Sequence, residues 1–129
     1  MSTFRAGVLI AAIALGLVAA PDPARARELE VTATAYNSVR RQTVGDPALT
    51  AWGDRLRPGM KAIAVSRDLI ELGLRHGVEV EIVGLEGRYV VRDKMAKRWR
   101  KKIDIYMGED VKAAREWGKR KVTIRWKPR

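Results

Sequence analysis

The chain has 129 residues, of which 47% are hydrophobic and 32% are charged, and its formal net charge is +11. This length fits one domain with a single core, and the composition excludes a disordered chain. The pI of about 10.6 predicts attraction to polyanions. The chain has no Cys and a single His, His76, so disulfides are excluded and no metal site is expected.

The first 26 residues have the layout of a secretory signal peptide. Arg5 supplies an early positive charge, residues 7–20 are apolar, and Ala24 and Ala26 form a small-x-small cleavage site. The apolar run is short for a membrane span, which needs roughly 20 apolar residues. We therefore expect cleavage that leaves residues 27–129 as one domain without a membrane span. Its expected location is the periplasm or cell envelope, with outer-membrane association or release from the cell as alternatives.

The predicted export determines which polyanions the positively charged protein can encounter. An exported protein rarely meets nucleic acid, so no nucleic-acid partner is expected. Peptidoglycan and other anionic envelope polymers are the polyanions that such a protein does meet, and we expect them as partners.

Short strand-like segments dominate residues 27–129. Six segments alternate between apolar and polar residues or form a short apolar run: 29–36, 61–65, 78–84, 88–93, 102–107 and 121–126. The third and fourth flank a Gly-containing turn and predict a hairpin. Short helices are expected at 66–73, with Ser66 as a candidate N-cap, and at 108–118. This pattern predicts a mainly β fold, a small barrel of about six strands with one or two short helices.

Two acids, Asp93 and Asp104, stand among the many Lys and Arg residues of 92–106. On one helix they would lie about 16 Å apart along the axis, whereas the carboxyls of glycosidase pairs lie roughly 5–10 Å apart. As the ends of two strands joined by the loop 94–102, they can converge. Convergence would raise the pKa of one carboxyl and let it donate a proton to a glycosidic oxygen. The alternative is that both acids cap turns or pair with neighbouring cations.

Five stretches occur in the order found in a known family: "VTATAY" (31–36), "GDPALTAWGDRLRPGMKAIAVSRDLIELG" (45–73), "GRYVVRD" (87–93), "KIDIYM" (102–107) and "AAREWGKRKVTI" (113–124). In these stretches the chain resembles the three-aspartate, or 3D, domain. That family looks like the C-terminal part of membrane-bound lytic transglycosylase A and is related to the rare lipoprotein A type double-psi β-barrel. The resemblance covers about residues 30–126.

The resemblance implies cleavage of peptidoglycan without a metal or cofactor. An aspartate on the "DIY"-like strand would protonate the bond between N-acetylmuramic acid and N-acetylglucosamine, and the muramyl 6-hydroxyl would then attack. Asp104 matches this acid, and Asp93 matches the aspartate that would support it. Tyr36, Thr50 and Gly53 match residues that line the family's cleft.

The chain also departs from the family pattern. Ser66 stands where the family's first aspartate is expected, so we retain Ser66 as a candidate substrate-binding residue. The family's Gly-rich loop is replaced by "KMAKRWRK" (94–101). Trp52 and Trp99 are candidates for stacking on sugars, and Tyr106 shares the strand face of Asp104. Outside these loops, aromatic residues such as Trp126 are expected in the core.

Two functions from different classes stay open. The first is an exported, lytic transglycosylase-like glycosidase that acts through Asp104. The second is a non-catalytic module that binds peptidoglycan or an anionic wall polymer, motivated by Ser66 and by the missing glycines. The Lys and Arg residues of 94–102 either bind peptide-stem carboxylates and anionic polymers or form a solvated loop.

Overall fold

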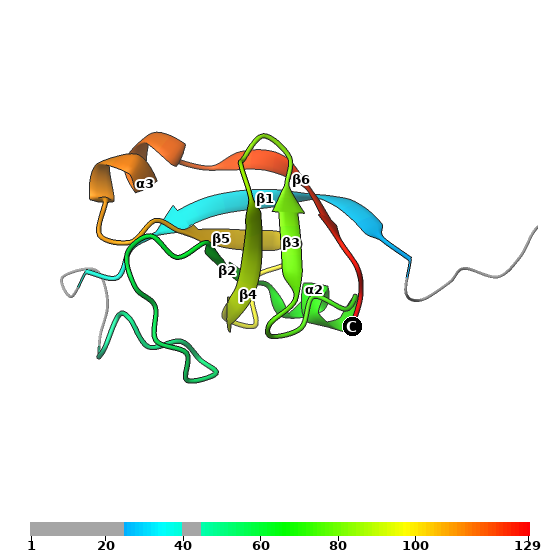
Figure 1. The fold of residues 1–129 in the computed structure, drawn as a ribbon, viewed down its shortest axis with the longest axis horizontal. Coiled ribbons are helices and arrows are strands. Elements are labelled where there is room, and N and C mark those ends of the chain that lie inside the picture. Colours follow the sequence, from blue (N-terminus) through cyan, green and yellow to red (C-terminus); the bar gives the residue numbers. More distant parts are fainter. Residues whose placement is uncertain (1–24, 40–44) are drawn as a thin grey trace, which may run out of the picture.

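The structure, a computed structural model, describes residues 25–39 and 45–129. Nearly all of the expected signal peptide, 1–26, lies outside these residues. Six strands form a closed barrel with two short helices beside it (Figure 1). The strands are β1 (Arg27–Tyr36), β2 (Ala62–Val65), β3 (Glu79–Ile82), β4 (Arg88–Lys94), β5 (Lys102–Tyr106) and β6 (Arg120–Trp126). The helices are α2 (Arg67–Glu71) and α3 (Val111–Trp117).

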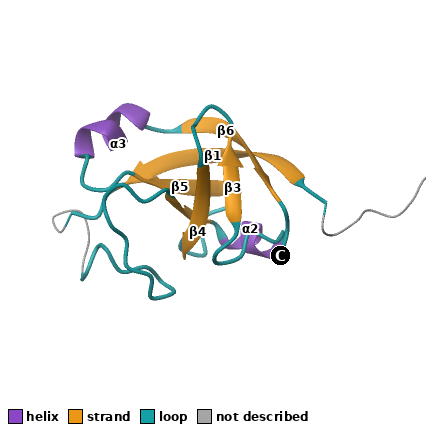
Figure 2. Cartoon of the chain, viewed as in Figure 1, coloured by secondary structure: helices purple, strands orange, loops and turns teal. Residues whose placement is uncertain are grey.

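The barrel is mixed, and its strands neighbour each other in the order β1-β5-β2-β4-β3-β6. The pairs β1–β5 and β2–β4 are parallel, and the other neighbouring pairs are antiparallel. The expected hairpin is the β3–β4 pair. The long connection between β1 and β2 extends from one end of the barrel (Figure 2). The mainly β, six-stranded barrel with two short helices, expected from the sequence, is therefore confirmed.

Alternating side chains of the strands fill the barrel. The expected inward faces are buried, including Val80 and Ile82 on β3 and Ile124 and Trp126 on β6. Every residue of β2 is buried, because this short strand lies between β4 and β5 and has a hydrophobic cluster on each face. None of the helices in the described part of the chain is long and apolar enough to span a membrane.

Ser66 stands at the N-cap position of α2, as expected, and its carbonyl accepts the N–H of Leu69 at 3.0 Å. Its side chain makes no capping hydrogen bond, and its hydroxyl instead accepts the N–H of Lys102 at 3.0 Å. The Ser66 N–H in turn donates to the Lys102 carbonyl at 2.9 Å. Ser66 follows directly on β2, beside β5, so its N–H and its hydroxyl continue the pairing of these strands.

The C-terminal tail packs on Gly73, and a side chain at this position would collide with the tail. The φ angle of Gly73 is +94°, and an added Cβ would lie 2.4 Å from Cβ of Pro128 and 2.7 Å from its Cα. We expect Gly73→Ala to lower the free energy of unfolding by roughly 2–4 kcal/mol, which combines left-handed strain and overpacking.

Gly84 provides the matched control for this substitution. Its φ angle is +96°, and no atom lies within 4 Å of an added Cβ. Gly84→Ala should therefore cost only the left-handed strain, about 1–2 kcal/mol. Urea unfolding of both variants measures the difference, and equal losses of stability would show that the tail does not constrain Gly73.

Candidate functional site

One groove of the barrel contains both of the acids singled out from the sequence. It has a volume of about 440 Å³ and is formed by the ends of β1 and β4, the middle of β2 and β5, the 46–49 loop and the segment after β4. Its lining residues include Tyr36, Ala64, Asp93, Trp99 and Asp104. The two aspartates lie on separate strands, as the strand-end alternative predicted.

Asp93 and Asp104 flank Ala64 from opposite sides. Ala64 pairs with Asp104 on β5 and with Asp93 on β4. Neighbouring strands lie about 4.8 Å apart, so the Cα atoms of the two acids lie roughly 10 Å apart with β2 between them. The small side chain of Ala64 leaves the space above β2 open to a ligand, and carboxyls facing each other across it can reach the roughly 5–10 Å separation of a glycosidase pair.

A bulge places Asp93 on this face. The register between β2 and β4 shifts at Ile63 and Ala64: Ile63 pairs with Val91, but Ala64 pairs with Asp93 and skips Arg92. In an unbroken ladder Arg92 would stand beside Ala64, because successive side chains point to opposite faces. The bulge therefore exchanges a guanidinium for a carboxylate at the groove.

Asp104 occupies the more protected place in the groove. The hydroxyl of Thr34, its neighbour on β1, donates to Asp104 Oδ1 at 3.0 Å. Burial raises the pKa of Asp104 above its ordinary value, and the charge of Asp93 acts in the same direction, while the Thr34 hydrogen bond and the Lys102 ammonium oppose them. With the net pKa raised, Asp104 is the carboxyl in this groove that is best suited to hold a proton.

Asp93 has a different environment. One of its oxygens, Oδ1, accepts the backbone N–H groups of Ala51 and Lys94, each at 2.9 Å. The carboxylate thus attaches the connection between β1 and β2 to the end of β4. Since Oδ1 is engaged with the backbone, Oδ2 is the oxygen left to face a ligand.

Tyr36 supplies a hydroxyl between the two acids. Burial, reinforced by the charges of Asp93 and Asp104, raises the pKa of the Tyr36 hydroxyl, so it stays protonated. The hydroxyl oxygen is buried and has no hydrogen-bond partner among the described residues. The Tyr36 ring leans on Tyr106, with ring centroids 5.5 Å apart. Tyr36 is therefore a donor held in place with its hydrogen bond still unused.

Two other aromatic candidates have different positions. Trp99 lines the groove, with the ammonium of Lys102 at 3.5 Å and the guanidinium carbon of Arg98 at 4.8 Å from its ring centroid. Tyr106 is buried outside the groove lining, and its hydroxyl lies 2.6 Å from Ser38 Oγ. Of these two, only Trp99 is placed to contact a ligand in the groove.

The remaining candidates, Thr50, Trp52, Gly53 and Ser66, do not line the groove. The Thr50 hydroxyl accepts the N–H of Asp54 at 2.9 Å, and Gly53 has a φ angle of +88° in the same turn. The Trp52 ring packs against the core and lies 5.1 Å from the His76 ring. Thr50, Trp52 and Gly53 belong to the long connection between β1 and β2 that Asp93 holds, whereas Ser66 follows β2.

Sequence reasoning missed Thr34 and Ala64 as parts of the site. Thr34 lies two residues before Tyr36 and therefore shares its strand face, which is the signal that could have indicated it. Ala64 carries no chemical group that a motif search would select. In the described part of the chain, no group of three His, Cys, Asp or Glu side chains is arranged to hold a metal ion.

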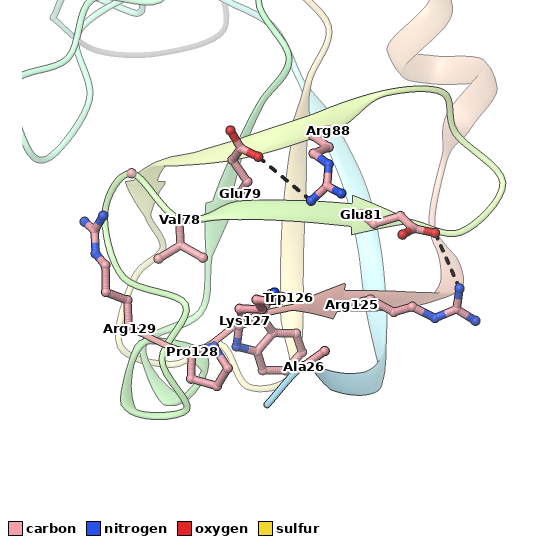
Figure 3. A pocket seen from close by; sticks show the side chains of 11 residues that line it. Ala26, Val78, Glu79, Glu81, Arg88, Arg125, Trp126, Lys127, Pro128 and Arg129 are labelled. Carbon is pink, nitrogen blue, oxygen red and sulfur yellow. Dashed lines mark hydrogen bonds and ion pairs between the residues drawn. The ribbon is translucent and has the colours of Figure 1, made fainter. Parts of the chain in front are cut away.

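A larger pocket of about 600 Å³ lies between β3, β6 and the C-terminal tail. Figure 3 shows its two acids paired with arginines: Glu79 with Arg88 at 3.9 Å, and Glu81 with Arg125 at 3.4 Å. Both carboxylates of this pocket are already engaged by guanidinium groups. The groove with Asp93 and Asp104 is therefore the stronger candidate site.

The raised pKa of Asp104 should be visible in the stability of the protein. Since the folded pKa is raised, the folded state binds more protons than the unfolded state above the unfolded pKa of about 3.9, and stability falls as pH rises through this window. Asp104→Asn keeps an oxygen that accepts the Thr34 hydrogen bond. It removes the loss of folding stability that comes from ionising the Asp104 carboxyl. We expect the variant to raise Tm at pH 7 and to have a smaller effect at pH 3.

The exposed acid Glu109 serves as the control for this experiment. Glu109→Gln removes the same charge, and we expect a similar small change of Tm at both pH values. Thermal unfolding followed by circular dichroism measures all three proteins. The quantity to compare is the Tm of Asp104→Asn minus the Tm of the unsubstituted protein. If this difference is smaller at pH 7 than at pH 3, the raised pKa of Asp104 is contradicted.

Comparisons with known proteins identify the fold. No protein-family model and no curated protein sequence matches the chain. A Streptomyces papain inhibitor has a similar structure, with a TM-score of 0.55 and 21% identity over 78% of this chain and 94% of the inhibitor. An expansin from Clavibacter michiganensis, in its apo form, is similar with a TM-score of 0.51 and 16% identity. That match covers 76% of this chain but only 49% of the expansin.

Proposed function

We propose that this protein binds the glycan strands of peptidoglycan in the groove that holds Asp93 and Asp104. The observation that carries the proposal is the lining of this groove, which includes two carboxyls, Tyr36 and the indole of Trp99. The Tyr36 hydroxyl is buried and has no hydrogen-bond partner among the described residues. Sugar hydroxyls both donate to carboxylates and accept from a phenol. An aromatic ring beside such polar groups suits the apolar face of a sugar ring.

Two further observations support a polymer of the cell wall as the partner. The barrel has the same fold as a bacterial expansin, and the net charge of +11 favours association with an anionic wall. The signal peptide expected from residues 1–26 would bring the protein to that compartment.

Removing the Tyr36 hydroxyl should weaken binding. On this proposal, a bound sugar must uncover the buried hydroxyl and accept its hydrogen bond. Tyr36→Phe deletes that donor and leaves the ring on Tyr106, so we expect the affinity for purified sacculi to fall roughly threefold to tenfold, which corresponds to about 0.6–1.4 kcal/mol for one hydrogen bond. Sedimentation of the protein with sacculi over a concentration series measures the affinity.

Tyr89→Phe is the matched control. Tyr89 is buried in the main core and does not line the groove, so its substitution should leave the affinity unchanged. Binding that falls equally in both variants, or in neither, would place the glycan elsewhere on the barrel. Failure of the unsubstituted protein to sediment with sacculi would refute the proposed function.

A second candidate function, cleavage of the bound glycan, is favoured by the raised pKa of Asp104. In this reaction the carboxylic acid of Asp104 gives its proton to the glycosidic oxygen as the bond from that oxygen to C1 of the muramyl sugar breaks. The muramyl 6-hydroxyl then bonds to C1 and returns its proton to the Asp104 carboxylate, which leaves a 1,6-anhydro end. The resemblance to the 3D domain family supports this candidate.

A further inference from the structure

The segment that replaces the expected Gly-rich loop is fixed in place at its first end. Met95 donates its N–H to the Val65 carbonyl at 2.9 Å, and the Met95 carbonyl accepts from Nε of Arg67 at 3.1 Å. Within the segment, the N–H of Trp99 donates to the Ala96 carbonyl at 3.2 Å. These bonds hold the segment against the end of β2 and the start of α2.

The second end of the segment is fixed just as firmly. Lys101 has a left-handed backbone, with a φ angle of +43°, which is costly for a residue with a side chain. Its N–H donates to Asp68 Oδ2 at 3.0 Å, and its carbonyl accepts from the N–H of Thr32 at 2.9 Å. The next N–H, that of Lys102, donates to Ser66 Oγ. Ser66 and Asp68 thus secure a segment that composition alone would describe as a solvated loop.

This anchored segment presents a concentration of positive charge, which we call the basic rim: Lys94, Lys97, Arg98, Arg100, Lys101 and Lys102. The side chains of Lys97 and Lys101 are exposed and make no ion pair with any described residue. Arg98 and Lys102 lie against the ring of Trp99. Asp68 beside Arg100 and Asp104 beside Lys102 offset part of this charge. The remaining like charges repel one another, so an anionic ligand would stabilise them.

The basic rim borders the groove directly. Lys94, Ala96 and Trp99 line the groove, so a strand lying across Asp93 and Asp104 would run along the rim. A peptidoglycan strand carries a peptide stem on each muramyl sugar, and the stems have free carboxylates. Cations beside the groove are therefore suited to pair with these carboxylates.

We propose that the basic rim recognises the carboxylates of the peptide stems, so that the protein distinguishes peptide-bearing strands from bare glycan. This inference rests on the proposed glycan binding in the groove and adds a determinant of specificity to it. Electrostatic recognition of this kind is sensitive to salt, unlike the contacts of sugars with Tyr36 and Trp99.

The test compares two double variants of equal charge. Lys97→Gln/Lys101→Gln removes two cations from the basic rim, and Lys119→Gln/Lys127→Gln removes two exposed lysines that do not line the groove. Binding is measured by fluorescence anisotropy with soluble glycan strands released by an endopeptidase from sacculi free of teichoic acid, both with their peptide stems and after an amidase has removed the stems. Equal Tm values establish that both variants fold.

We expect the unsubstituted protein to bind strands that carry peptide stems roughly threefold to tenfold more tightly than stripped strands at low salt, as two or more exposed ion pairs would give. The rim variant should lose most of this preference, and the control variant should keep it. Equal affinity of the unsubstituted protein for both materials, or equal losses in the two variants, would overturn the inference and leave glycan binding standing. Binding to neither material would refute the proposed function itself.

Discussion

Asp104→Asn is expected to lower the release of 1,6-anhydro muropeptides from sacculi by roughly 10²–10⁴-fold, the usual contribution of a general acid. The amide has nearly the same shape as the carboxyl and can still accept the Thr34 hydrogen bond, but it has no proton to give. Mass spectrometry of the soluble products measures the release. Sedimentation with sacculi should be retained by the variant, because the remaining groove lining is unchanged.

Thr34→Val tests the role of the Asp104 carboxyl by removing the hydroxyl that donates to it. The Thr34 hydrogen bond lowers the pKa of Asp104, so its removal should raise this pKa further and move the alkaline limb of the pH–rate profile to higher pH. Thr32→Val is the control, since Thr32 pairs with Lys102 and not with Asp104.

Release of 1,6-anhydro muropeptides that persists undiminished in Asp104→Asn would exclude Asp104 as the acid. If the unsubstituted protein and Asp104→Asn both bind sacculi and neither releases 1,6-anhydro muropeptides, binding remains the function.

Trp126→Ala is expected to lower the free energy of unfolding by roughly 3–5 kcal/mol, as for other large core residues. Trp126 is 4% exposed, and its Nε1–H donates to the Leu72 carbonyl at 3.2 Å. It lies on β6, where it pairs with Arg27 of β1 and Val80 of β3. Because total stabilities of small domains are only about 5–15 kcal/mol, this loss would bring the barrel close to unfolding.

Trp99→Ala is the matched control for this prediction. Trp99 is only partly buried and belongs to neither hydrophobic core cluster, so its removal should cost less than about 1 kcal/mol. Trp126→Phe separates volume from the hydrogen bond, since it keeps a buried ring and loses the bond to Leu72. Guanidinium unfolding gives the three values, and similar losses for Trp99→Ala and Trp126→Ala would contradict the assigned core.

The sequence by itself determined the architecture of this protein. Alternation with a period of two, or a short apolar run in the case of β2, identified each strand to within a few residues. Alternation also identified the inward faces of β3 and β6, because side-chain direction in a strand is a local property. The expected helix 108–118 is shorter in the structure, Val111–Trp117. Its first turn is capped by Asp110, which accepts the N–H of Ala113 at 2.9 Å, and Gly108 before it has a left-handed backbone.

Only the tertiary structure decided which residues share the groove. Along β4, Asp93 has the same phase as the buried Val91 and Tyr89, so strict alternation would turn it toward the core. The bulge beside Ala64 breaks this phase and brings Asp93 onto the row of Thr34, Asp104 and Ala64. Strand register and bulges arise from pairing between segments that are distant in the sequence, and therefore no local pattern encodes them.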